Sequence, residues 1–398
     1  MDGNPEQKPA EAVSPEIPGM KEARARMDSK YWDAREGNLT LTQEVMRELA
    51  EDFKNRLMPT VQALEKVAIT FENPLVLATA LPLVQNMRIN RALADIASVP
   101  EGQTMIDDLG ETKVKIQPDP RFSGGSNIFF PSYKNGEMTV KNFEIHAQGY
   151  AKHGTVVAIL LHELHHERQV KGGVMKVFND KVPSPVEQLW YERAMEADAQ
   201  ATATDIAWKL KEAGKPAAWN ALAGGFNCMG HIAKAYERNV DKLPNAVATG
   251  TAKRAAFDAW FTAKNMFGDS LSEIYNTQAL QNMPSAENMD AMKKAGKPFT
   301  PLTVDDIAKL GDIAEVNYLK APGGKPLDSI DYRRADYNAW QSSSLNFKHQ
   351  VYDEIKAGTY QPPGVNSKFT VPKEPAIPNI AMPTSAASVV RASKLKLY

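Results

Sequence analysis

Two histidines and one glutamate in His162-Glu163-x-x-His166 have the residue types and the spacing that metal-dependent hydrolysis needs. Residues four apart lie on the same face of a helix, so both imidazoles can reach one metal ion. Glu163 lies beside such an ion rather than on it, where its carboxylate can accept a proton from a metal-bound water. The pattern therefore predicts that His162 and His166 are metal ligands and that Glu163 is a general base.

The stretch 156–169 is predicted to be the helix that positions this pattern. Residues 156–161 are all apolar, the second half of the stretch is charged, and Gly172 and Gly173 end it. The histidines thus stand at the end of a buried helical segment, where an imidazole pair without a partner would cost free energy. A bound metal ion is the partner that we expect.

A following helix is predicted to supply a third ligand. Ser184, Pro185 and Glu187 form a capping box with proline at the first helical position, which marks a helix start. Glu192 and Glu196 fall on an otherwise apolar, alanine-rich face of this helix, and a carboxylate there needs a metal, a cation or hydrogen-bond donors. Glu196 is the economical choice as the third ligand of a zinc site, and Glu192, one turn earlier, is the alternative.

These two helices resemble those of the thermolysin-like zinc peptidases, the gluzincin group. In that group H-E-x-x-H lies on one helix, and the third ligand comes from a following helix, often within E-x-x-A-D-x-x-A or E-x-x-A-N-x-x-A. Residues 196–203 read E-A-D-A-Q-A-T-A, so the glutamate and both alanines match, and Gln200 stands where Asp or Asn is usual. The chain looks most similar to poorly characterised bacterial metallopeptidases.

The resemblance implies one Zn²⁺ per chain, with Glu163 as the base and with three ligands: His162, His166 and Glu196. It also implies that Gln200 orients a ligand histidine, through an amide that carries no charge. Peptide hydrolysis needs a donor for the developing oxyanion as well. The resemblance places that donor beyond the second helix, where Tyr275 and His231 are candidates.

Composition narrows the classes of partner. The 398 residues are 43% hydrophobic and carry a net charge of −1, so nothing favours nucleic acid or an anionic membrane as a partner. The single cysteine, Cys228, excludes an internal disulfide and a cysteine-based zinc site. Because no signal peptide and no transmembrane run is visible, we expect a soluble, cytoplasmic protein, with export by a signal-less route left open. The expected partner is a peptide or protein substrate, and the oligomeric state is open.

Periodicity and composition divide the chain into five predicted parts. They are a disordered N-terminal tail, a helical segment, a zincin-like core, a second helical segment and a disordered, basic Pro/Ser-rich tail, with bounds 1–38, 39–109, 110–285, 286–357 and 358–398.

Alternation of polar and apolar residues predicts strands in the core. It occurs in 113–116 and 138–140, and 127–130 and 142–146 also look like strands, all upstream of the H-E-x-x-H helix. The predicted fold class is therefore α+β, a mainly helical zincin-like core with a small antiparallel or mixed sheet. In the enzymes that the chain resembles, an edge strand of this sheet pairs with extended substrate, and 138–146 is the expected edge strand.

A second function stays open beside the peptidase. Gln200 in place of Asp or Asn, and the lack of an obvious oxyanion donor, also fit a catalytically inactive zincin-like module with a structural or partner-binding role. Zinc would then stabilise the fold without any peptide being cut.

Overall fold

The computed structural model describes residues 32–33, 38–41, 88–109, 113–118, 125–134, 137–147, 152–174, 176–224, 228–264, 270–320 and 337–361. Much of the predicted parts 1–38, 39–109 and 358–398 lies outside these residues, so the five-part division stays a prediction. Within the described part, no helix combines the length and the apolar character needed to cross a membrane.

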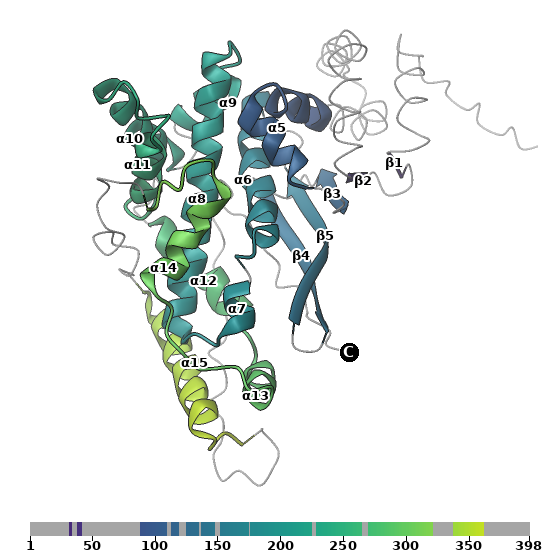
Figure 1. The fold of residues 1–398 in the computed structure, drawn as a ribbon, viewed down its shortest axis with the longest axis vertical. Helices are drawn as coiled ribbons and strands as arrows, with labels where there is room; N and C mark the ends of the chain where they lie inside the picture. The colour runs from purple at the N-terminus through teal and green to yellow at the C-terminus, as the bar shows by residue number, and fades with distance from the viewer. Residues whose placement is uncertain are drawn as a thin grey trace, which may run out of the picture.

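Helices account for most of the described chain, and α6 and α8 lie side by side at its centre (Figure 1). Helices α10 and α11 lie on the other side of α8 from α6. The helical elements are α5 (Pro100–Asp107), α6 (His153–Lys171), α7 (Lys176–Asp180), α8 (Pro185–Glu212), α9 (Ala217–Ala223), α10 (Met229–Lys242), α11 (Thr251–Trp260), α12 (Leu271–Asn282), α13 (Ala286–Lys294), α14 (Val304–Ala308), the 3-10 helix η2 (Lys309–Ile313) and α15 (Ala339–Ala357). Residues 88–96 are helical as well.

The α+β fold class predicted from the sequence is wrong. Helix makes up 71% of the interpretable part of the structure, which is therefore mainly α-helical. Helices also supply nearly all of the described core, to which the strand segments contribute Ile116 and Ile145. Alternation of polar and apolar residues identifies segments that can form strands, but it does not show how many core residues they contribute. Here most of the core residues come from helices.

The extended segments of the described chain pair with one another. They are β1 (Trp32–Asp33), β2 (Asn38–Leu41), β3 (Lys113–Pro118), β4 (Gly125–Lys134) and β5 (Glu137–Ala147), paired in the order β1-β2-β3-β5-β4. The predicted substrate strand 138–146 falls in β5, which pairs with β3 on one side and with β4 on the other. The pairing with β3 covers only residues 142–147, so the expectation of an edge strand is wrong for 142–146, where both sides of β5 are paired. Among the described strands, residues 138–140 pair with β4 alone.

Local sequence signals predict where α8 begins and where α6 ends. The Ser184 backbone N–H donates to Glu187 Oε2 at 2.8 Å, and Pro185 is the first residue of α8. Helix α6 ends at Lys171 with Gly172 as its C-cap, and Gly173 has a φ of 84°, a left-handed conformation that suits glycine. Short-range chemistry therefore sets one end of each helix.

Small side chains bring α6 and α8 close together. Ala194, Ala197 and Ala201 of α8 are fully buried and share one core cluster with Val157 and Leu161 of α6. Because the distance between packed helices depends on the side chains at their contact, alanines allow a close approach. Polar side chains that project from the two helices can then meet.

The start of α6 is pressed against the start of α9. A Cβ atom added at Gly154 would lie 2.0 Å from the Ala217 carbonyl oxygen, which no real contact allows. We expect Gly154→Ala to lower the free energy of unfolding by about 1–3 kcal/mol, the usual cost of overpacking a core. Urea unfolding measures this, with Thr155→Ala at the half-buried neighbouring position as the control. An unchanged midpoint for Gly154→Ala would contradict the close α6–α9 contact.

Candidate metal centre

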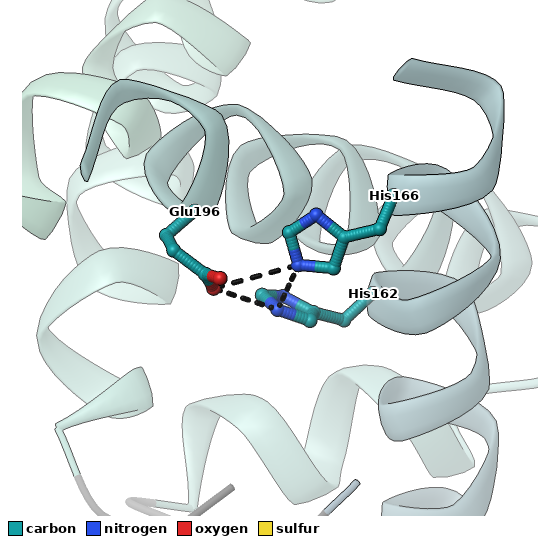
Figure 2. A group of neighbouring side chains, drawn as sticks. All are labelled: His162, His166 and Glu196. Atoms are coloured by element: carbon teal, nitrogen blue, oxygen red, sulfur yellow. Dashed lines mark hydrogen bonds and ion pairs between the residues drawn. The ribbon is translucent and has the colours of Figure 1, made fainter. Parts of the chain in front are cut away.

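Three side chains from the two central helices point toward one spot. Figure 2 shows His162 and His166 extending from α6 and Glu196 reaching them from α8. The two Nε2 atoms lie 3.0 Å apart, and Glu196 Oε2 lies 3.2 Å from His162 Nε2 and 3.5 Å from His166 Nε2. Among the described residues, this is the group of histidine, cysteine and acidic side chains that could hold a metal ion.

The geometry of this group fits a tetrahedral ion. Ligand atoms that each lie about 2.0–2.2 Å from a zinc ion are about 3.3 Å apart. The three distances above scatter around that value. Two imidazole nitrogens and one carboxylate oxygen can each direct a lone pair toward the same point, and a cation placed there binds all three. Three protein ligands leave the fourth position for water.

The electrostatics of the group favour a cation as well. Burial opposes the charge of Glu196, but the imidazoles of His166 and His162 hold the pKa of its carboxyl well below the usual range. Burial would also lower the pKa of His166, yet Glu196 and Glu163 together raise it to about 9. The spot thus attracts positive charge, which a proton or a divalent ion can supply.

Glu163 is buried next to the group. It follows His162 on α6 and is only 4% exposed. Burial raises the pKa of its carboxyl, and the charges of His162 and His166 oppose that rise. A carboxylate whose pKa is raised by burial is a stronger proton acceptor than one in water, which is the property that a general base needs.

Glu192, the alternative ligand, is not part of the group. The three ligand atoms that lie together come from His162, His166 and Glu196. Burial and the nearby charge of Glu196 raise the pKa of Glu192 to about 8, with Lys348 opposing the rise. This raised pKa favours the protonated form of Glu192, which binds a metal ion less well than the ionised Glu196 does.

The described contacts give Gln200 no support in the orienting role that the resemblance implies. Its side-chain amide is engaged within α8, where Nε2 lies 3.5 Å from Thr204 Oγ1. Instead, the ring nitrogen Nδ1 of His166 lies 2.9 Å from Oε1 of Gln169. Gln169 is the next residue of the same helix face, three positions after His166, and this i,i+3 spacing was the available sequence signal.

Two further polar residues near the ligands, Asp198 and His165, pair with each other. Asp198 is buried on α8 two residues after Glu196, and its Oδ2 lies 2.8 Å from His165 Nε2. The ring of His165 is buried as well. The periodicity of apolar residues along a helix does not reveal a polar pair that is buried away from the ligand face.

The described contacts of the two candidate oxyanion donors lie elsewhere. His231 is exposed on α10, and its Nε2 lies 3.2 Å from Thr262 Oγ1. The ring of Tyr275 packs on Trp260, with centroids 5.5 Å apart. These contacts give neither residue support as an oxyanion donor.

A helical core that brings both histidines of H-E-x-x-H and a glutamate of the next helix to one spot defines a candidate metal-dependent hydrolase. Residues 131–317, which include the whole group, match the model of a family described as "Putative metallopeptidase family (DUF6782)". No curated protein and no solved structure matches the chain. The family match supports a resemblance to metallopeptidases in general, and the thermolysin-like grouping stays a prediction.

Proposed function

We propose that this protein is a zinc-dependent peptidase that acts on a peptide or protein substrate. The observation that carries the proposal is the meeting of His162 Nε2, His166 Nε2 and Glu196 Oε2 at distances that suit one tetrahedral ion. The family match adds the class of reaction, since its description names metallopeptidases. Zinc is preferred because two histidines and a carboxylate with an open fourth position are a usual catalytic zinc set.

Each residue has a defined task in the proposed reaction. His162, His166 and Glu196 hold the ion, and Glu163 does not bind it. A bound zinc ion supplies a water of lowered pKa and polarises the scissile carbonyl. Glu163 accepts the proton of that water and delivers it to the amine nitrogen that leaves, so its carboxylate is restored when the peptide bond breaks.

Metal content and activity test this proposal together. We expect elemental analysis of the purified protein to find about one zinc per chain, as three protein ligands at a single site imply. A chelator should abolish cleavage of an unstructured protein such as casein, and added zinc should restore it. A protein that takes up no zinc even when zinc is offered would contradict the proposal.

The inactive module is the second candidate, because the described contacts give neither Tyr275 nor His231 support as an oxyanion donor. In that case zinc raises the melting temperature, since a ligand that binds only the folded state stabilises it. Casein would then stay intact at every zinc concentration. Measuring melting temperature and cleavage on the same zinc-loaded sample separates the two functions.

A further inference from the structure

The side-chain amide of Gln169 has only one orientation that its neighbours allow. Its Nε2 lies 2.9 Å from the Met195 carbonyl oxygen and 2.8 Å from Asp198 Oδ2. Both partners accept hydrogen bonds, so both amide hydrogens are used. Turning the amide over would set its carbonyl oxygen against two other oxygens. Oε1 of Gln169 must therefore face His166.

This orientation determines which nitrogen of His166 carries the proton. An amide oxygen can only accept, so His166 Nδ1 donates its N–H to Gln169 Oε1 across 2.9 Å. In the neutral imidazole the other nitrogen, Nε2, then keeps its lone pair. Nε2 is the atom that faces His162 and Glu196. Gln169 thus presents the lone pair of His166 to the place where an ion would bind.

Asp198 is held firmly enough to act as the support of that amide. Its carboxylate is buried, and it accepts hydrogen bonds from Gln169, from His165 and from the hydroxyl of Tyr318. The nearest of these partners in sequence lies 29 residues away and Tyr318 lies 120 residues away, so Asp198 joins distant parts of the chain.

The same contacts also tie the two ligand helices together. Gln169 belongs to α6, one turn after His166, and its two acceptors, Met195 and Asp198, flank Glu196 on α8. The amide therefore connects the turn that carries one ligand to the turn that carries another. A shift of one helix along the other would break both of its hydrogen bonds.

We propose that Gln169 and Asp198 are the positioning residues of the metal site. Asp198 fixes the amide of Gln169, and this amide fixes the ring of His166 with Nε2 aimed at the ion and keeps Glu196 in register with it. The inference rests on the proposed function, in which His166 is a ligand. It assigns to these two residues the role that the resemblance implied for Gln200.

The substitution that tests the role of Gln169 is Gln169→Met, which keeps the length of the side chain and removes the amide. We expect its zinc affinity, measured by competition with a chromophoric chelator, to fall by about 10–100-fold, the usual cost of losing an outer hydrogen bond to a ligand histidine. The absorption bands of Co²⁺ bound in place of zinc should shift as well, because the ring is free to turn.

Gln188→Met is the matched control. Gln188 is also a buried glutamine, and its Nε2 donates to the backbone carbonyl of Pro183 at 3.1 Å. This hydrogen bond involves none of the three ligand residues. We expect both variants to lose folding stability and only Gln169→Met to lose zinc affinity. An equal loss of affinity in both would show that the effect is general loosening of the fold, and would overturn the positioning role.

A double-mutant cycle tests whether Asp198 acts through Gln169. Asp198→Asn should weaken zinc binding in the natural sequence, but should have little further effect when Gln169→Met is already present, because residues in one network are not additive. Additive losses would overturn the link between them. If Asp198→Asn does not fold, the comparison of Gln169→Met with Gln188→Met still decides the role of Gln169.

The results separate this inference from the function on which it rests. Zinc binding that is equally tight in the natural protein and in Gln169→Met would overturn the inference and leave the proposed peptidase standing. A natural protein that binds no zinc would overturn both.

Discussion

Glu163→Gln is expected to retain zinc and to lower the rate of peptide hydrolysis by about 10²–10⁴-fold, the usual contribution of general acid–base catalysis. Glutamine has nearly the same size and shape as glutamate, so the buried position stays filled. Its amide cannot accept the proton of the attacking water, however. The ligand group of His162, His166 and Glu196 is untouched, so zinc content should match that of the natural protein.

Two quantities are measured on the same preparation: the initial rate of casein cleavage and the zinc content per chain. Glu187→Gln is the matched control, because it is the same substitution on the other site helix. Glu187 accepts hydrogen bonds from the backbone of Ser184 and Leu302 at the start of α8, and we expect its variant to cleave as the natural protein does. A zinc-loaded Glu163→Gln that cleaves at the natural rate would show that Glu163 is not the base.

Short-range signals in the sequence anticipated the elements that carry the site. The capping box at Ser184 and the glycines after Lys171 mark the ends of α8 and α6 because each signal acts within one helical turn. The stretch of 13 residues, 172–184, that separates the helices keeps them neighbours. His162, His166 and Glu196 therefore come together as the spacing of the residues suggested.

Long-range contacts could not be anticipated in the same way. Whether Asp198 is buried with Tyr318 depends on how a segment 120 residues away packs, and no local pattern carries that information. The choice of Gln169 over Gln200 depends on which helix face meets the neighbouring helix, which needs the rotation of α8 against α6. The fold class failed for the same reason, because alternation at 113–146 says nothing of how much core the helices bury.

Glu196→Ala is expected to lose zinc, while Glu192→Ala keeps about one ion per chain, as a site with three ligands requires. Removing Glu196 takes away one of three ligands and leaves two imidazole nitrogens 3.0 Å apart. The fall in zinc affinity should exceed the roughly 100-fold that marks the loss of an outer hydrogen bond. Removing Glu192 takes away a half-buried acid that is not one of the three ligands and whose pKa is raised to about 8, so the site should change little.

Melting curves with and without zinc provide a second readout for the same pair of variants. A ligand at about 1,000 times its dissociation constant stabilises the folded state by about 4 kcal/mol, so zinc should raise the melting temperature of the natural protein and of Glu192→Ala. The melting temperature of Glu196→Ala should be the same with and without zinc. If Glu192→Ala instead loses the ion and Glu196→Ala keeps it, the two acids exchange roles. Because they lie one turn apart on α8, the metal would then sit one helical turn closer to Pro185, away from the Met195–Asp198 turn that Gln169 holds.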